Sequence, residues 1–362
     1  GGSTIDCSKV IAASVAYPGD AWDIVIGKAE ITKVLPVFSV LTLSATGSEM
    51  DPTAVISNME TNDKEAVANP GMLPKASVLD PSYTFSVSKS QTAAGTADIM
   101  SHIFEVYFSR VKDAYMQDRM AEALLKTCIK YGIIAVNEPD NYEARANLMW
   151  SSSWAINGLL TMGKEVAWTV HGIEHELSAY YDITHGVGLA ILTPAWMEYV
   201  LSDETVDKFA EYGVNVWDID KSLDKYEIAH KAIDKTREYF KLMGIPSSLS
   251  ELGIGEENFE IMAEKSARGL DAAYVPLKKE DIIITPVSKR DSAPEDIKKL
   301  LDDAYADIQK AAKTTDLYAQ MADVLKAAGS EATPDDLVVS DLFDVSFSDN
   351  YGGYMDTEGN TL

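Results

Sequence analysis

The sequence lacks several features that mark whole classes of protein. It has only two cysteines, Cys7 and Cys128, too few and too far apart for a disulfide framework or a thiolate metal site. No run of about 18 uninterrupted apolar residues occurs, so no membrane span is predicted. The first residues carry neither a basic start nor an apolar run, so no secretory signal is predicted. These absences together predict a cytoplasmic protein.

Basic residues are also scarce. The chain has 31 Lys and Arg against 57 Asp and Glu, which gives a formal net charge of −26. This charge argues against binding to nucleic acid, because phosphate backbones are bound by clustered Lys and Arg. Part of the excess lies at the C-terminal end, where eight acidic residues and no Lys or Arg follow Lys326. Such a block is typical of a solvated tail.

Apolar spacing indicates an α/β part followed by an all-helical part. Residues 37–43 and 76–79 are short apolar runs rich in β-formers, which predicts two buried strands. From about Ser88 the apolar residues recur at helical spacing in segments of about 12 to 20 residues. Each helical segment needs neighbouring helices to cover its apolar face, so residues 86–285 are predicted to form one helical domain.

A third region is predicted at residues 286–362. Ser292 followed by Ala293-Pro294-Glu295 resembles a helix start, with a serine cap and Pro-Glu in the first turn. One or two amphipathic helices are expected to run to about Ala328, and the acidic tail then begins. No function is predicted for this region.

Histidine is rare: the chain has five histidines, all of them in the helical part, and the first four fall between residues 102 and 185. Asp98 and His102 are four residues apart, so one helix face carries both, with Cβ atoms roughly 6 Å apart. His171 and His175 repeat this spacing on a second helix, and His185 begins a further helix after a break. Imidazole and carboxylate ligands without thiolate suit Fe(II) or Zn(II). The fifth histidine, His230, lies among charged residues and is predicted to be exposed.

The same histidines allow a second interpretation. His171-Gly172-Ile173-Glu174-His175 matches the H-x-x-E-H pattern of inverted zinc peptidases, in which both histidines bind zinc and the glutamate activates water. This interpretation leaves Asp98, His102 and His185 without a role. A zinc hydrolase therefore remains as the alternative function.

Two short segments are candidates for binding a nucleotide. The start, Gly1-Gly2-Ser3, is either a linker remnant or a glycine-rich loop whose backbone N–H groups face a phosphate at a helix N-terminus. The polar turn at residues 44–49 follows a predicted strand, and α/β sheets bind ligands beyond the ends of their strands. The residues alone leave both segments open.

Taken together, these segments resemble the iron-containing (group III) alcohol dehydrogenases, and most closely their NADPH-dependent butanol dehydrogenase branch. The resemblance runs in family order from residue 1 to about residue 285. The matching stretches are Gly1-Gly2-Ser3-x-x-Asp6, Leu41-Thr42-Leu43-x-Ala45-Thr46-Gly47-Ser48-Glu49, Asp63-Lys64, Val78-Leu79-Asp80-Pro81, Asp98-x-x-x-His102, Arg145-Ala146-Asn147-x-Met149-Trp150, Asn157-Gly158-Leu159, His171-x-x-x-His175-Glu176-Leu177 and His185-Gly186.

The resemblance implies an architecture and a reaction. Residues 1–85 would be the remnant of a dinucleotide-binding domain, and residues 86–285 an all-helical metal-binding domain, as in dehydroquinate synthase and iron-type alcohol dehydrogenases. The implied activity is hydride transfer between a small primary alcohol or aldehyde of the butanol type and a nicotinamide, with NADP(H) favoured over NAD(H). A metal would act as Lewis acid. A homodimer is a further family expectation.

The resemblance also implies site residues. The metal ligands would be Asp98, His102, His171 and His185. His175 would lie beside the substrate and the nicotinamide and relay a proton. The cofactor would be contacted by Gly1, Gly2, Ser3, Asp6, Thr42, Thr46, Ser48 and Lys64.

The chain departs from the family pattern at both ends. Family members carry earlier strands of the dinucleotide fold, so the chain resembles an N-terminally truncated member whose sheet has an open edge. Weak NADPH binding and doubtful turnover are therefore expected of this chain alone, and a non-catalytic remnant is a further alternative. Family members also end soon after a segment like residues 276–282, and residues 286–362 match nothing in them.

Overall fold

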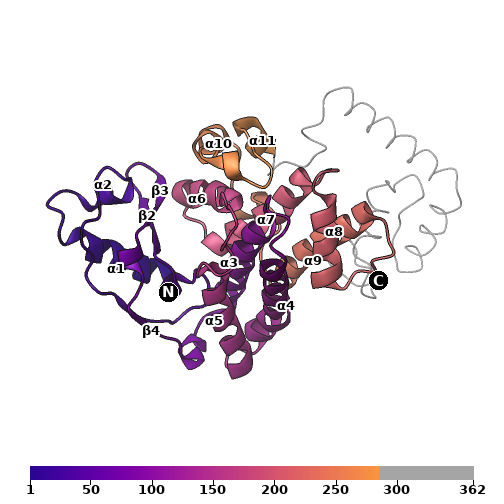
Figure 1. Cartoon of the computed structure of the whole chain (residues 1–362), viewed down its shortest axis with the longest axis horizontal. Helices are drawn as coiled ribbons and strands as arrows, with labels where there is room; N and C mark the ends of the chain where they lie inside the picture. Colours follow the sequence, from indigo (N-terminus) through magenta and orange to yellow (C-terminus); the bar gives the residue numbers. More distant parts are fainter. Residues whose placement is uncertain (285–362) are drawn as a thin grey trace, which may run out of the picture. The chain divides into compact units, whose positions relative to one another are not determined.

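Residues 1–284 are the part of the chain that this computed structural model describes, and they belong to one unit, Gly1–Pro286 (Figure 1). The helix start at Ser292, the helices expected up to Ala328 and the acidic tail all lie outside the described residues. None of the helices in the described part is long and apolar enough to cross a membrane.

The first part of the chain is a small α/β assembly. It combines helices with a parallel strand pair and an antiparallel hairpin, and the helices contact the hairpin. The elements are α1 (Gly2–Ser14), α2 (Ala21–Val25), β1 (Phe38–Val40), β2 (Thr53–Asn58), β3 (Asp63–Ala68) and β4 (Ala76–Val78). β1 runs parallel to β4, and β2 and β3 form the hairpin. Both predicted strands are therefore present, at β1 and β4.

The burial predicted for the two strands is wrong on one face of each, and in β4 both Ala76 and Val78 are exposed, Val78 at 52%. Phe38 and Val40 are 68% and 54% exposed, while Ser39 between them is buried. The physical reason is that, within residues 1–284, β1 pairs only with β4 and nothing covers the face that carries Phe38 and Val40. Apolar composition predicted the strand correctly but could not tell which of its faces is covered.

The hairpin of β2 and β3 was not predicted from the sequence. It pairs residues 53–58 with residues 63–68, and the turn between the strands includes Asn62 in the left-handed region at φ 51°. β3 contacts helix α6 of the helical part, while β2 contacts α1. The hairpin therefore bridges the two parts of the described chain beside the functional site.

The second part is all-helical, and the α/β-then-helical fold predicted from the sequence is confirmed. Its helices are α3 (Lys89–Tyr107), α4 (Tyr115–Asn137), α5 (Tyr142–Ile156), α6 (Thr169–Tyr181), α7 (His185–Val200), α8 (Val206–Trp217), α9 (Lys225–Leu242), α10 (Phe259–Ser266) and α11 (Lys279–Ile284). α3 packs against α4, α5, α6 and α7 and forms the centre of this part (Figure 1).

Sequence explains why α3 is central. Ser88 caps it by accepting a hydrogen bond from the backbone N–H of Gln91. All residues from Thr92 to Tyr107 are buried, so the helix is covered on every side. Ile99, Ile103 and neighbouring apolar side chains belong to the main hydrophobic core. The few polar groups on this helix are therefore enclosed, and burial of an unpaired carboxylate among them costs several kcal/mol.

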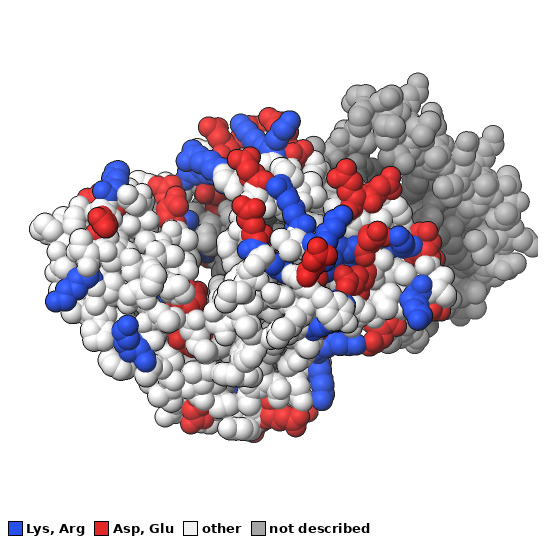
Figure 2. All heavy atoms as spheres, viewed as in Figure 1, with Lys and Arg blue, Asp and Glu red and all other residues white. Residues whose placement is uncertain are grey.

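Surface charge is unevenly distributed over the described residues. Figure 2 shows Lys, Arg, Asp and Glu side chains crowded together over the region of α8, α9 and α10, whereas the surface over α1 and β4 carries fewer of them. His230, on α9, is exposed as predicted. Charges of both signs mix on this face, which favours local ion pairs.

Candidate metal centre and cofactor cleft

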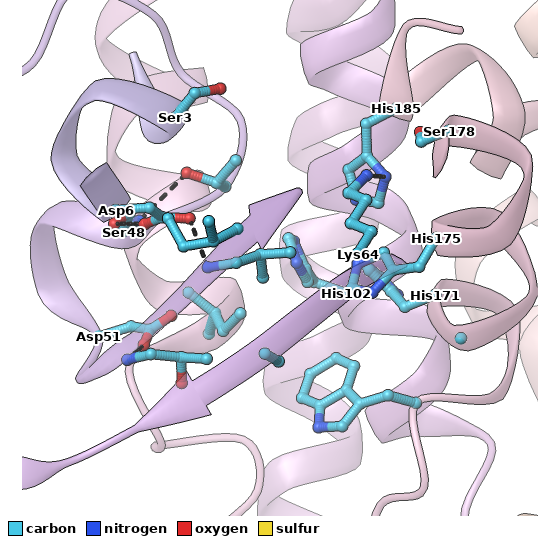
Figure 3. Close-up of a pocket in the computed structure, with 18 of the residues that line it drawn as sticks. Ser3, Asp6, Ser48, Asp51, Lys64, His102, His171, His175, Ser178 and His185 are labelled. Atoms are coloured by element: carbon cyan, nitrogen blue, oxygen red, sulfur yellow. Dashed lines mark hydrogen bonds between the residues drawn. The ribbon is translucent and has the colours of Figure 1, made fainter. Parts of the chain in front are cut away.

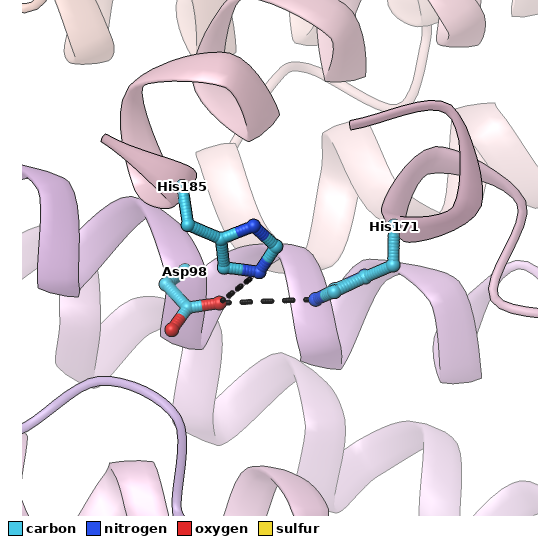
Figure 4. A group of neighbouring side chains, drawn as sticks. All are labelled: Asp98, His171 and His185. Carbon is cyan, nitrogen blue, oxygen red and sulfur yellow. Dashed lines mark ion pairs between the residues drawn. The ribbon is translucent and has the colours of Figure 1, made fainter. Parts of the chain in front are cut away.

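Three helices bring the predicted ligand side chains together. α3 presents Asp98 and His102 from one face, α6 presents His171 in its first turn, and α7 begins at His185. In Figure 4, two dashed lines join the Asp98 carboxylate to the rings of His171 and His185. The helical spacing within α3 and α6 is readable from the sequence, but the meeting of the three helices results from packing of the core.

The distances define a compact group. The Asp98 Oδ1 atom lies 3.7 Å from His171 Nε2 and 3.6 Å from His185 Nε2. The potential ligand atoms of these three residues all lie within 4.8 Å of one another. His102 lies beside them, with Nδ1 3.6 Å from Asp98 Oδ1 and its ring stacked on that of His171 at 4.5 Å between centroids. Three of the four predicted ligands therefore form one group, and His102 lies directly beside it.

The polar atoms of this group fit a bound cation. Asp98 Oδ1, His102 Nδ1 and His171 Nε2 are buried and have no hydrogen-bond partner among the described residues. Buried polar atoms are almost always paired, and each one left unpaired costs free energy. A divalent metal would satisfy a carboxylate oxygen and several imidazole nitrogens at once. The donor set therefore matches the metal expected from the sequence.

The electrostatics of the group favour a positive charge at this point. Burial alone would raise the pKa of Asp98, but the neighbouring imidazoles, led by that of His102, outweigh burial and hold the pKa below its usual value. Burial lowers the pKa of His102 to about 3. Burial also lowers the pKa of His171, but Asp98 and Glu105 outweigh it and raise the pKa to about 9. The buried carboxylate thus stays ionised, and it favours a positive charge beside it, either on a protonated His171 or on a bound metal ion.

Glu105 is a functional residue that the sequence reasoning missed. Its carboxylate pairs with His171 Nδ1 and accepts the backbone N–H groups of Val170 at 2.7 Å and His171 at 3.1 Å. A carboxylate on the far nitrogen fixes the tautomer of a metal-binding histidine and orients its ring. A signal was present, because Glu105 is three residues after His102 and so on the same face of α3.

Replacing Glu105 with glutamine is expected to weaken metal binding by roughly 10- to 100-fold, the effect typical of lost partners of metal-bound histidines. The amide keeps the shape but removes the charge that stabilises His171 with Nε2 aimed at Asp98. Titration of the metal-free protein with Zn(II) against a chelator measures the change. Glu227→Gln, at an exposed ion pair on α9, is the matched control. Equal affinity in the two variants would contradict the role given to Glu105.

Glu174 holds neighbouring side chains in place, whereas the glutamate of the peptidase pattern activates water. It is fully buried; its Oε2 pairs with His185 Nδ1, and its Oε1 accepts a hydrogen bond from Ser178. The Lys64 Nζ atom lies 3.4 Å from both Glu174 Oε2 and His185 Nδ1. A carboxylate engaged in this way is not placed to activate a water molecule.

His175 also departs from the peptidase pattern. Its potential ligand atoms group with Glu174 and His185, whereas those of His171 group with Asp98 and His185. The two histidines of His171-x-x-Glu174-His175 therefore share no ligand group among the described residues, as zinc peptidase chemistry would require. The Lys64 ammonium already supplies a cation beside Glu174 and His185. The geometry does not support the hydrolase alternative.

A cavity of about 980 Å³ lies between the α/β part and the histidines. In Figure 3, Ser3, Asp6, Ser48 and Asp51 lie on one side, and Lys64 with the labelled histidines lies on the other. Five of the eight predicted cofactor residues line it: Ser3, Asp6, Thr46, Ser48 and Lys64. Its helical wall includes Trp168, whose ring packs edge-on against His102 and His171. The cavity is large enough for a cofactor and a small substrate.

The other three predicted cofactor residues lie beside the cavity and are not part of its lining. Gly1 precedes α1 and donates through its amino group to the Thr42 hydroxyl at 3.3 Å. Gly2 begins α1, and a Cβ there would lie only 2.6 Å from the Thr46 methyl carbon, which explains glycine at this position. Close approach between the helix start and the Thr46 loop thus depends on Gly2.

Asp6 and the missed residue Lys9 fix the loop that lines the cavity. Lys9 is fully buried and donates to the Ser48 hydroxyl and the carbonyls of Asp51 and Thr53, at 2.6 to 2.8 Å. Asp6 accepts hydrogen bonds from Ser48 and from the backbone N–H of Val55. Both side chains therefore tie α1 to residues 48–55, and burial lowers the pKa of Lys9.

Comparison with known proteins agrees with this geometry. The profile of the iron-containing alcohol dehydrogenases matches residues 1–81, and that of the C-terminal domain of the same family matches residues 92–287. Together the two matches cover nearly all of the residues that the structure describes. The chain belongs to the iron-containing alcohol dehydrogenase family.

Individual relatives support the same assignment. NADH-dependent butanol dehydrogenase A of Clostridium acetobutylicum is 64% identical over 286 residues, which span 78% of this chain and 74% of that protein. NADPH-dependent aldehyde reductase YqhD of Escherichia coli is 40% identical over 269 residues, 73% of this chain and 69% of that protein. The crystal structure of NADH-dependent butanol dehydrogenase A from Thermotoga maritima superimposes with a TM-score of 0.75 at 38% identity, over 79% of this chain and 73% of that chain.

The family assignment carries a coarse function. The protein is an oxidoreductase of the alcohol dehydrogenase and aldehyde reductase type. Family membership implies a metal and a nicotinamide cofactor, and the described residues include a candidate metal-binding group. The identity of the metal, the form of the nicotinamide and the role of each site residue remain predictions.

Proposed function

We propose that the protein interconverts small primary alcohols and aldehydes of the butanol type. The observation that carries the proposal is that Asp98, His102 and His171 bring together three buried ligand atoms without a hydrogen-bond partner in the described part of the chain, and that His102 and His171 also line the cavity. The relatives named butanol dehydrogenase and aldehyde reductase support the substrate class.

Four residues are proposed to hold a divalent metal, Fe(II) or Zn(II): Asp98, His102, His171 and His185. Their imidazole and carboxylate donors suit either ion. When bound, the metal would act as Lewis acid on the substrate oxygen while the nicotinamide exchanges a hydride with the carbon that bears it. Glu105 and Glu174 orient two of the histidines from behind.

The cofactor is proposed to lie along α1 and the Thr46 loop. Gly1, Gly2, Ser3 and Asp6 would line the pyrophosphate loop at the start of α1, where free backbone N–H groups favour an anion. Thr42, Thr46, Ser48 and Lys64 would contact the ribose, phosphate or nicotinamide end. For the form of the cofactor, the sequence resemblance favours NADP(H), whereas the names of the Clostridium and Thermotoga relatives favour NADH. The two are therefore tested side by side.

His175 is proposed to relay a proton between the cavity and solvent. It lines the cavity one turn after His171, and its ring centroid lies 5.5 Å from that of His185. Burial and the neighbouring Lys64 lower its pKa well below the usual value, which keeps the ring neutral. A homodimer is retained as a proposal from the family resemblance.

A parallel assay tests the proposed function. The protein is loaded with Fe(II) or Zn(II) and mixed with butanal and either NADH or NADPH, and the absorbance of the reduced nicotinamide is followed. A peptide-cleavage assay runs beside it. Metal-dependent loss of the reduced nicotinamide is expected, with no peptide cleavage, because the site offers a metal position and a cavity for both reactants.

Each other outcome supports a different function. Peptide cleavage that disappears with Glu174→Ala would establish the hydrolase. Tight metal binding without turnover of either kind would support the non-catalytic remnant. Turnover of butanal, in contrast, would contradict the expectation that this chain binds its cofactor poorly.

A further inference from the structure

Two adjacent residues at the start of β3 carry opposite charges, and each forms an ion pair with a helix of the helical part. Asp63 pairs with Lys265 of α10 at 2.7 Å, and Lys64 pairs with Glu174 of α6 at 3.4 Å. The strand pairing places Asp63 opposite Asn58, at the end of the hairpin next to the turn. Two ion pairs thus attach the tip of the hairpin to two different helices. The hairpin supplies the acid in one pair and the base in the other.

Lys265 makes the more extensive of the two attachments. Its Nζ atom donates to the Asp63 carboxylate at 2.7 Å and to the backbone carbonyl of Asn62 at 2.8 Å. Asn62 is the turn residue with a positive φ, a backbone conformation that residues other than glycine rarely adopt. Lys265 therefore binds the hairpin at its most strained backbone position. The ammonium also lies 3.7 Å from the Glu176 carboxylate and 5.2 Å from the Tyr180 ring centroid, both on α6.

Burial makes this contact stronger than an ordinary surface ion pair. The side chain of Lys265 is 19% exposed and that of Asp63 is 32% exposed. Partly buried pairs that also bind backbone lose less to solvent screening than exposed pairs do. In agreement, the hydrogen bond from Lys265 holds the pKa of Asp63 below its usual value.

The neighbouring residue reaches the metal site. The Lys64 Nζ atom lies 3.4 Å from His185 Nδ1, on the side of the ring opposite to Asp98, and its side chain lines the cavity. Lys64 follows Asp63 directly, so the position of the Asp63 backbone determines where Lys64 can reach. Lys64 and Glu174 are 110 positions apart in sequence, and only the placement of the hairpin brings them together.

We infer that Lys265 is a positioning residue for the proposed oxidoreduction, which acts through the Asn62–Lys64 segment by holding the Lys64 ammonium against Glu174 and His185. This inference rests on the proposed function for its effect on turnover. The attachment of the hairpin can be measured without metal or cofactor.

Lys265→Met tests the inference, because it removes the ammonium and keeps an apolar stem. In the metal-free protein, amide hydrogen exchange in residues 63–68 is expected to become about tenfold faster, while exchange in α3 stays unchanged. Lys265→Arg should restore slow exchange. Lys279→Met is the matched control, since Lys279 also pairs with carboxylates of α10, Glu260 at 2.6 Å and Glu264 at 3.8 Å, and its ion pairs in the described part of the chain do not involve the hairpin. Equal exchange in Lys265→Met and Lys279→Met would overturn the inference.

Turnover provides the second readout. With metal, nicotinamide and butanal, Lys265→Met is expected to lower kcat/KM by on the order of tenfold, as small misplacements of a site group do. The same substitution in a Lys64→Met background should cause no further loss, because Lys265 acts through Lys64. A loss of the same size in both backgrounds would overturn the inference. If wild-type protein failed to consume reduced nicotinamide, the proposed function would fail while the exchange experiment still decided the role of Lys265.

Discussion

Replacing His171 with alanine is expected to abolish stoichiometric metal binding and to lower kcat/KM for butanal by about a thousandfold or more, since Lewis-acid catalysis contributes several kcal/mol. His171 Nε2 is one of the three candidate ligand atoms that are buried without a hydrogen-bond partner among the described residues. It lies 3.7 Å from the Asp98 carboxylate. Without this imidazole, the remaining donors cannot complete a four-ligand site.

The fold should tolerate this change, which allows the effect on metal to be separated from misfolding. Glu105 loses its imidazole partner in His171→Ala but keeps the backbone N–H groups of Val170 and residue 171. Metal content by mass spectrometry, circular dichroism and turnover are measured on the same preparations. His230→Ala, at an exposed histidine on α9, is the control. Retention of one tightly bound metal per chain in His171→Ala would remove the basis of the proposed site.

Replacing Gly186 with alanine is expected to destabilise the protein by about 3 kcal/mol, the upper part of the range for overpacked cores, and to weaken metal binding as well. A Cβ at this position would lie 2.6 Å from the carbonyl carbon of Ala94 and would overlap its oxygen. This neighbour is the backbone of α3, which cannot rotate away. α7 would have to move from α3, and His185, the preceding residue, would move with it.

Gly172 offers a matched comparison for this prediction. It also follows a predicted ligand, His171, within a helix, but a Cβ there would meet no atom within 4 Å. Gly172→Ala is therefore expected to leave metal binding unchanged and to stabilise the helix by about 0.5 to 1 kcal/mol. Thermal unfolding of the metal-free proteins and Zn(II) titration measure both effects. Similar unfolding temperatures for the two variants would show that α3 and α7 are not in the close contact described here.

The candidate ligands were predictable because their signals are local. Asp98 and His102 are separated by one helical turn, as are His171 and His175, so the sequence alone assigns each pair to one helix face. The apolar neighbours of Asp98 indicated that its helix is buried, and α3 is enclosed from Thr92 to Tyr107. The residues that match the family pattern then identified which acid and which imidazoles belong together.

The supporting residues were less predictable for two different reasons. Glu105 shares a helix face with His102 and could have been found, but nothing in the sequence tells which imidazole it will meet. Lys9 reads as an ordinary helix lysine, yet it is fully buried because the loop at residues 48–53 folds over it. The exposure of Phe38 and Val40 was mistaken because composition predicts a strand and not what covers it.

The sequence by itself determined the order of an α/β part and a helical part, the helices that carry the histidines and the family to which the chain belongs. Tertiary structure alone decided that three separate helices place Asp98, His171 and His185 around one point, and that the β2–β3 hairpin delivers Lys64 to the same place. The physical reason is the range of each effect. Helical periodicity fixes neighbours within a turn or two, whereas contacts such as that of Lys64 with Glu174 arise only when the whole core packs.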